Sequence, residues 1–314
     1  MTFITYITNK ECYNMYIFGG IHMTIAYLIH SERPYDELQE LLSQLTKQGD
    51  HVFIMINDNE LRDQIAFTFM EYSRVHISQK QMYAQEGDLS LARGTLMQMK
   101  EALQLKNQEF DYFINLTDGM VPLKSRMEIL NYLEQYPDKD FYYVDRSEKD
   151  DPELRKKTEK YYPYTNIITF PTNKFVRTMT KGMASILYTF HSRRTLEDEI
   201  LIGSPWFVLT RKSAEILVEN FSYCSNTYKL SWYAEELYIP MMLHKFAPER
   251  YQEHINDDLR AVGEGKWIES HVALPCTPQA IEVHPNALYG GRISAETEAS
   301  LYSSYFDIYN ANLG

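Results

Sequence analysis

Thr24-Ile-Ala-Tyr-Leu-Ile-His30 is a short run of apolar, β-branched and aromatic residues, a composition that predicts a buried strand. After Pro34, four leucines repeat at helical spacing and share one face of a predicted helix: Leu38, Leu41, Leu42 and Leu45. Gly49 ends that helix, and His51-Val-Phe-Ile-Met-Ile-Asn57 predicts a second buried strand. A strand, a helix and a strand at this spacing form a βαβ unit, which requires a parallel pair and a right-handed crossover.

The same alternation continues through the first half of the chain. We expect a short strand at residues 75–77, a helix between residues 88 and 105 that Asp88 could cap, and a strand at residues 110–116. A helix at residues 127–135 and a strand at residues 141–144 follow. Residues 23–145 are therefore predicted to form one doubly wound α/β half.

Residues 146–314 form the second predicted half, with a weaker pattern. Mixed charge around Pro152 indicates an exposed loop or a solvated helix at residues 145–160, and residues 161–200 show no clean period. A strand is expected at residues 203–210, then helices at 211–221 and 233–246. Pro240 must lie in the first turns of the last helix or kink it. Residues 1–22 are interpreted as weakly ordered, and as either an extension or the result of a mis-chosen start.

Composition narrows the class of protein. The formal net charge of −12 argues against a protein that binds nucleic acid over its surface. Cys12, Cys224 and Cys276 are too widely spaced for a metal motif or a disulfide framework, which fits a reducing compartment. No apolar run approaches the ~20 residues that span a bilayer, and the first residues make a poor signal peptide. We therefore expect a cytoplasmic protein.

Several motifs of known chemistry are absent. The chain has no glycine-rich dinucleotide fingerprint, no Walker lysine loop, no paired zinc histidines and no nucleophile elbow. The remaining acids at strand ends are Asp58 and Asp118, and Glu235-Glu236 is an acidic pair within a predicted helix. A metal ion on a diphosphate would require two acids separated by one residue after a strand, and no second acid lies two residues away from Asp145. The pattern favours a reaction without a bound metal.

Five segments, in the same order, resemble the core-2/I-branching β-1,6-N-acetylglucosaminyltransferases, the family that also includes the peptide O-xylosyltransferases. They are Ile25-Ala-Tyr-Leu-Ile-His30; Gly87-Asp-Leu-Ser-Leu-Ala92; Phe110-Asp-Tyr-Phe-Ile-Asn-Leu116 with Pro122-Leu-Lys-Ser125; Gly203-Ser-Pro-Trp-Phe-Val-Leu-Thr-Arg211; and Ala234-Glu-Glu-Leu-Tyr238. The resemblance implies a GT-A glycosyltransferase fold, a Rossmann-like doubly wound sheet whose second half binds the acceptor. It also implies a UDP-sugar donor, inversion at the anomeric carbon, and neither a metal nor another cofactor.

The resemblance also assigns roles to acidic residues. Glu236 corresponds to the family's catalytic base, and Glu235 is expected beside the acceptor. Without the resemblance, Glu236 would be interpreted as a solvated helix carboxylate. The family's further acid falls at Met120 here, and Asp118 could replace it or merely stabilise its turn. Lys124 and Trp267 correspond to acceptor-binding residues, although a surface lysine and a structural tryptophan are equally good interpretations.

The donor site is less well defined by the resemblance. Ligands of α/β sheets bind at strand ends and helix starts, and four candidate donor-binding residues lie at such predicted positions: His30, Asp58, Gly87 and Ser90. The two cations that the family places on the diphosphate fall at Asn286 and Tyr305 in this chain. Arg292, which follows two glycines, is the replacement candidate, with Arg260 and Lys266 as alternatives.

The sequence therefore predicts an inverting transferase, of a bacterial kind, that moves a sugar from a nucleotide-sugar donor to a glycan. N-acetylglucosamine and xylose are the expected sugars, and the acceptor could be a lipid-linked glycan at the inner membrane face. Any membrane association would be peripheral, since no basic amphipathic helix is evident. The altered cations leave open a non-catalytic glycan- or nucleotide-sugar-binding protein. A nucleotidyltransferase-like enzyme is a third reading, and it would require Mg²⁺.

Overall fold

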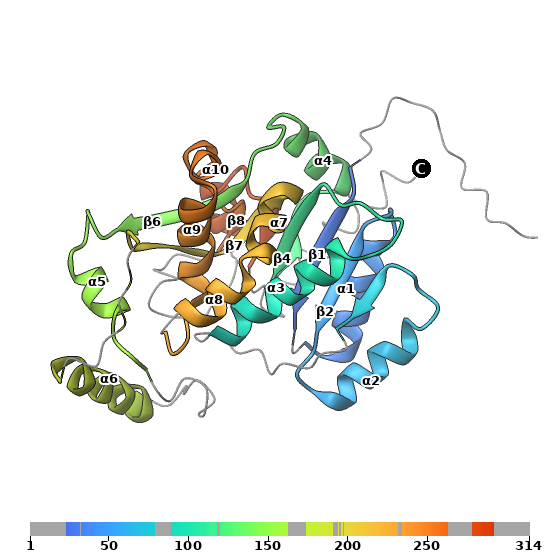
Figure 1. Cartoon of the computed structure of the whole chain (residues 1–314). Helices are drawn as coiled ribbons and strands as arrows, with labels where there is room; N and C mark the ends of the chain where they lie inside the picture. Colours follow the sequence, from blue (N-terminus) through green and yellow to red (C-terminus); the bar gives the residue numbers. More distant parts are fainter. Residues whose placement is uncertain are drawn as a thin grey trace, which may run out of the picture.

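A computed structural model describes residues 23–31, 33–78, 89–117, 120–162, 174–190, 194, 196, 198–231, 234–262 and 278–291. The predicted extension at residues 1–22 lies outside these ranges. A six-stranded sheet in the order β3-β2-β1-β4-β7-β6 forms the centre of the molecule (Figure 1). Its strands are β1 (Ile25–His30), β2 (His51–Met55), β3 (Val75–Ile77), β4 (Tyr112–Leu116), β6 (Phe141–Ser147) and β7 (Leu201–Thr210).

The predicted βαβ alternation is confirmed for the first four strands. β1 pairs in parallel with both β2 and β4, and β2 pairs in parallel with β3. The order then departs from a simple doubly wound sheet, because β7 inserts between β4 and β6 and runs antiparallel to both. A mostly parallel sheet with helices on both faces agrees with the predicted α/β class.

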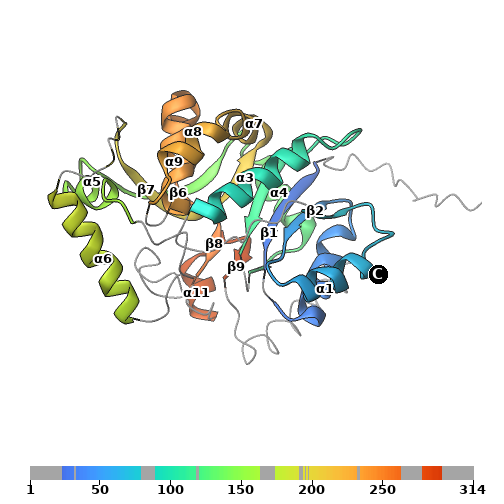
Figure 2. The same cartoon turned by 60° about the horizontal axis from the view of Figure 1, so that its bottom comes forward.

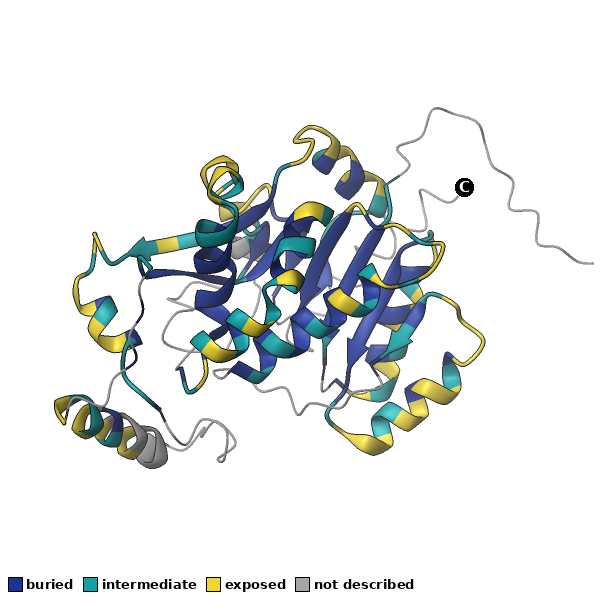
Figure 3. Cartoon of the chain, viewed as in Figure 1, coloured by how far each residue is buried: buried dark blue, intermediate teal, exposed yellow. Residues whose placement is uncertain are grey.

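Alternate residues of each central strand face opposite cores. Ile25, Tyr27 and Ile29 of β1 pack with α1 (Tyr35–Thr46), α2 (Asn59–Thr68) and α4 (Arg126–Glu134). Ala26 and Leu28 pack with the helices of the other face: α3 (Leu89–Leu103), α7 (Arg211–Glu219), α8 (Phe221–Thr227) and α9 (Ala234–Phe246). The strands are thus buried on both faces, which explains their continuous apolar runs (Figure 3).

Most predicted helices occur within a residue or two of their expected ends. Ser125 caps α4 in a capping box, because its hydroxyl accepts from the Glu128 N–H and the Glu128 carboxylate accepts from the Ser125 N–H. The helix expected at residues 211–221 is divided into α7 and α8. Pro240 lies inside α9, which continues through it to Phe246.

The charged segment after β6 contains α5 (Glu153–Thr158), as one of the two expectations allowed. The absence of a clean period at residues 161–200 was misleading, because α6 (Lys174–Thr189) lies there. Two further short helices are α10 (Pro248–Glu253) and α11 (Pro278–Val283). Among the described residues, no helix is long and apolar enough to cross a membrane.

A second, three-stranded sheet has the order β5-β9-β8, formed by β5 (Val121–Pro122), β8 (Arg260–Ala261) and β9 (Tyr289–Gly290). It joins the segment after β4 to two segments near the end of the described chain. The predicted division at residue 145 falls inside β6, so the expected halves share the central sheet. Their separate roles stay a prediction.

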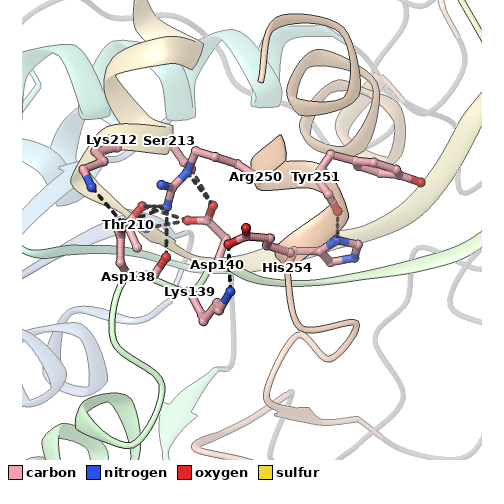
Figure 4. A network of polar contacts seen from close by, with 10 residues as sticks. Asp138, Lys139, Asp140, Thr210, Lys212, Ser213, Arg250, Tyr251 and His254 are labelled. Carbon is pink, nitrogen blue, oxygen red and sulfur yellow. Dashed lines mark hydrogen bonds and ion pairs between the residues drawn. The ribbon is translucent and has the colours of Figure 1, made fainter. Parts of the chain in front are cut away.

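A polar network attaches α10 to the start of β6 and the end of β7 (Figure 4). The Asp140 carboxylate accepts from the Thr210 N–H at 2.8 Å and from the Ser213 hydroxyl at 2.5 Å, and forms an ion pair with Arg250 at 3.1 Å. Arg250 also donates to the hydroxyls of Thr210 and Ser213, at 2.5 and 2.7 Å. Because α10 directly follows α9, this network anchors the carboxyl-terminal end of α9.

Candidate functional site

A pocket opens at the carboxyl ends of β1 and β4, the neighbouring strands at which the strand order reverses. In open α/β sheets this position is the usual ligand site. Side chains from both strands, from α3, from β7 and from the first turns of α9 surround it: Leu28, His30, Leu91, Ala92, Thr95, Gln98, Asn115, Leu116, Thr117, Pro205, Glu235 and Tyr238.

Asn115 holds β4 and β7 together where their backbones separate. The ladder between these strands ends at the pair Ile114–Val208. Beyond it, the Asn115 side-chain amide donates to the Pro205 carbonyl at 2.8 Å and accepts from the Phe207 N–H at 2.8 Å. A side chain therefore replaces the backbone hydrogen bonds, and the separation of the strands leaves room for the pocket.

Gln98 fixes the α3 wall of the pocket in a similar way. Its side-chain amide donates to the carbonyls of Ile29 at 2.6 Å and Phe53 at 3.0 Å, so it joins α3 to β1 and β2. Neither Gln98 nor Asn115 was singled out from the sequence. The signal was present, since each is a polar residue within an otherwise apolar buried segment, where an unpaired polar group is costly.

Glu235 and Glu236 lie in the first turn of α9 and are both buried. Burial raises the pKa of Glu236 well above its usual value, and the adjacent Glu235 carboxylate raises this pKa further. Arg146 of β6 lowers the pKa of Glu236, while Asp145 opposes Arg146. The amino-terminal end of a helix favours negative charge, so α9 also helps Glu236 to ionise. A carboxylate held this way is a strong base once deprotonated.

The structure brings two of the predicted site residues, His30 and Glu235, to the wall of one pocket. Glu236 is the next residue and is fully buried, so Glu235 rather than Glu236 lines the pocket. Ser90 lies beside the pocket residue Leu91, in the first turn of α3. The roles predicted for these residues stay predictions.

Two other predicted residues lie away from these walls. Asp58 is exposed and caps α2 by accepting from the Leu61 N–H at 2.7 Å. Lys124 lies between β5 and α4 and does not line the pocket. The cap gives Asp58 a structural reason to be present, whatever part it has in donor binding.

Arg260 is buried and bonded within the protein. Its guanidinium donates to the carbonyl of Asn115 at 2.8 Å and to the carbonyl of Phe207 at 3.2 Å, and it lies 4.5 Å from the centre of the Tyr289 ring. Burial lowers its pKa. These contacts favour a structural role for Arg260, which links the small sheet to β4 and β7.

The remaining positions discussed from the sequence lie outside the described residues: Gly87, Asp118, Trp267, Arg292, Lys266 and Tyr305. The two described positions at which the sequence departs from the family are Met120, which is buried in a core, and Asn286, which is exposed. The glycine before Arg292 has a packing role, since a Cβ on Gly291 would lie 2.8 Å from Val262. Within the described ranges, no three His, Cys, Asp or Glu side chains gather closely enough to hold a metal. The expectation of a metal-independent reaction stays a prediction.

Comparison with known proteins places this architecture in a family. The model of the Core-2/I-Branching enzyme family matches residues 25–288, from the first residue of β1 to the residue before β9. The chain belongs to that family. The central sheet is consistent with a GT-A-like glycosyltransferase fold, and the predicted resemblance is confirmed.

Relatives of this Core-2/I-Branching enzyme include xylosyltransferase 2 of Mus musculus, 25% identical over 211 residues, which are 64% of this chain and 22% of the relative. Xylosyltransferase 1 of Homo sapiens is 23% identical over 123 residues, 38% of this chain and 13% of the relative. The chain thus matches about a fifth or less of these much longer relatives. Family and relatives together support a glycosyltransferase.

Proposed function

We propose that this Core-2/I-Branching enzyme transfers a sugar, N-acetylglucosamine or xylose, from a UDP-sugar to a glycan hydroxyl, with inversion and without a bound metal. The observation that carries the proposal is the buried pair Glu235-Glu236 beside a pocket at the carboxyl ends of β1 and β4. Xylose has support from the names of the relatives, and N-acetylglucosamine from the resemblance of the sequence.

In this proposal Glu236 is the general base. Inversion is a single in-line displacement, so one carboxylate must accept the proton of the acceptor hydroxyl as its oxygen attacks the anomeric carbon. The bond from that carbon to the diphosphate breaks, and UDP leaves. The raised pKa of Glu236 makes its carboxylate a stronger base than an exposed glutamate. Glu235, which lines the pocket, would contact the acceptor.

The acceptor in this proposal is a glycan, which can be carried on a lipid at the inner face of the membrane. The protein would act from the cytoplasm through a peripheral contact. No nucleic acid partner is expected, in keeping with the net charge of −12.

The proposal can be tested by measuring hydrolysis and transfer with a panel of UDP-sugars, with and without EDTA. Four proteins are compared: wild type, Glu236→Gln, Glu235→Gln and Glu134→Gln. Glu134 is exposed at the end of α4 and controls for loss of a carboxylate elsewhere. We expect turnover that survives EDTA, collapses in Glu236→Gln and persists in Glu134→Gln. Glu235→Gln should raise the KM for the acceptor more than it lowers kcat.

Other results would contradict parts of the proposal. Turnover unaffected in Glu236→Gln would remove Glu236 from the mechanism, and collapse in Glu235→Gln alone would transfer its role to that residue. Loss of turnover in EDTA, restored by Mg²⁺ or Mn²⁺, would show a metal-dependent reaction. UDP binding without turnover for any donor and acceptor would identify a nucleotide-sugar-binding protein instead.

A further inference from the structure

Arg194 is a buried cation, only 5% exposed, and it forms no ion pair with a carboxylate of the described residues. Its guanidinium donates instead to three neutral oxygens: the carbonyl of Thr158, the carbonyl of Thr227 at 3.2 Å and the hydroxyl of Ser231. Burial lowers the pKa of Arg194 to about 10, because the protein interior disfavours its charge. A buried charge without a counter-charge is costly, so these three contacts require a reason.

The three oxygens belong to segments that are far apart in the sequence. Thr158 is the last residue of α5, Thr227 is the last residue of α8, and Ser231 lies three residues before α9 begins. The Arg194 N–H adds a fourth contact, to the Glu159 carbonyl at 2.8 Å. In both views α5 lies to the left of α8 and α9 (Figures 1 and 2). Arg194 therefore ties the end of α5 to the connection between α8 and α9.

The connection between α8 and α9 contains a strained residue, Leu230, whose φ is 59°. Residues with a Cβ rarely adopt this left-handed conformation. Two backbone hydrogen bonds hold it: the Leu230 carbonyl accepts from the Tyr162 N–H, and the Ser231 N–H donates to the Tyr228 carbonyl, both at 3.0 Å. Strained residues persist only where their surroundings fix them, and they cluster at functional sites. The strain at Leu230 therefore indicates that the place of this connection matters.

We propose that Arg194 is a positioning residue: it fixes the connection that leads into α9 and so sets the place of Glu236 beside the pocket. This role rests on the proposed function, in which Glu236 is the general base. A base must come within hydrogen-bond reach of the acceptor hydroxyl, and a displacement of about 1 Å can cost about 10²-fold in rate. Because α9 begins three residues after Ser231, a shift of the connection would move Glu236 as well.

Arg250 provides a matched control, because it anchors the other end of α9. Its guanidinium is partly buried and forms an ion pair with Asp140 at 3.1 Å. Glu236 and Phe246, the last residue of α9, are ten residues apart, so about 15 Å of helix separates them. Loss of the Arg250 side chain should therefore destabilise the fold and leave Glu236 in place.

The test compares wild type, Arg194→Lys, Arg194→Ala and Arg250→Ala, each assayed well below its own midpoint of unfolding. Arg194→Lys keeps the charge but lacks the planar fork that reaches three oxygens, so kcat should fall by about 10²-fold. The Kd for UDP should stay unchanged, because Arg194 does not line the pocket. Guanidinium chloride at millimolar concentration should restore part of the kcat of Arg194→Ala, since the free ion can replace the missing group. Arg250→Ala should lose stability and keep its kcat.

The pH profile of kcat distinguishes positioning from a general loss of folding. The kcat of wild type should rise with pH as Glu236 ionises. A displaced α9 would admit water to Glu236 and lower its raised pKa, so the acidic limb of the Arg194→Lys profile should move to lower pH. The acidic limb of the Arg250→Ala profile should stay where it is in wild type.

The inference is overturned if folded Arg194→Lys keeps the wild-type kcat and pH profile, or if Arg250→Ala loses kcat equally. A Kd for UDP that weakens in step with kcat would also overturn it, because Arg194 would then belong to the donor site. Wild-type protein without turnover, or turnover that survives in Glu236→Gln, contradicts the proposed function and this inference with it. Normal wild-type turnover beside an unaffected Arg194→Lys contradicts the inference alone.

Discussion

Asp140 and Glu236 are both buried carboxylates, but their surroundings differ. Asp140 receives hydrogen bonds from Thr210 and Ser213 and pairs with Arg250 (Figure 4). Glu236 lies beside a second acid, and burial raises its pKa. The first arrangement compensates a charge and joins β6, β7, α7 and α10. The second makes the charge costly, so the Glu236 carboxylate is more basic than an exposed glutamate once it is ionised.

The comparison predicts that Glu236 matters most for turnover. Glu236→Gln keeps the shape of the side chain but cannot accept a proton, so kcat should fall by about 10²–10⁴-fold. Thermal unfolding of the same variant should show no loss of stability. Asp140→Asn, assayed well below its own midpoint of unfolding, should retain most of the wild-type kcat. A large loss of kcat in a fully folded Asp140→Asn protein would contradict this distinction between the two carboxylates.

Asp140 should instead matter most for stability. Asp140→Asn removes a buried carboxylate from the partly buried guanidinium of Arg250, so the free energy of unfolding should fall by about 3 kcal/mol. Urea denaturation measures this change. Asp138→Asn is the matched control, because Asp138 also pairs with Arg250 but is half exposed, and its loss should cost less than about 1 kcal/mol.

Asn115 tests whether an uncharged polar side chain in the pocket contributes to stability, as Asp140 is expected to do. Asn115→Leu would leave the Phe207 N–H and the Pro205 carbonyl without their side-chain partner, at a cost of about 2 kcal/mol. Urea denaturation again provides the measurement. Unchanged stability would mean that β4 and β7 close the gap with direct backbone bonds. In that case Asn115 would be free to serve the ligand.

The smallest expected effect is on the pH dependence of stability. The folded pKa of Glu236 is raised, so its buried neutral form is tolerated at low pH, and stability is lost as pH rises through that pKa. Glu236→Gln has no such titration. The two proteins should differ least in stability below about pH 4.5, and the variant should become the more stable of the two as the pH rises above that value. A constant difference at every pH would contradict this interpretation.

The order of strands and helices in the first half could be predicted because each element has a local signal. Apolar runs identify the strands, and the leucine spacing identifies α1. The position of β7 between β4 and β6 had no such signal, since it depends on pairing between distant segments. α6 had no clear signal either, because residues 161–200 show no clean period, and Met179, Ile186 and Phe190 of this segment are exposed rather than buried in a core.

Candidate site residues could be predicted where a residue type suited to catalysis or binding stood at a strand end or at the start of a helix. The acidic pair was recognised by resemblance, and His30 by its place at the end of β1. Arg260 and Asp58 show the limit, because a residue type suited to a ligand is equally suited to holding two strands or capping a helix. Gln98 and Asn115 could have been found as polar residues in apolar segments, but their partners are known only from the folded chain.

The pairing of β6 has a consequence for how the chain folds. β6 leaves the ribosome more than fifty residues before β7, the only strand of the described sheet that it pairs with along its length. Until β7 is synthesised, β6 and the outer edge of β4 are open to other chains. Assembly of this side of the sheet must therefore be a late, long-range step of folding, and slow. Nascent chains halted near residue 150 should be the form most dependent on chaperones.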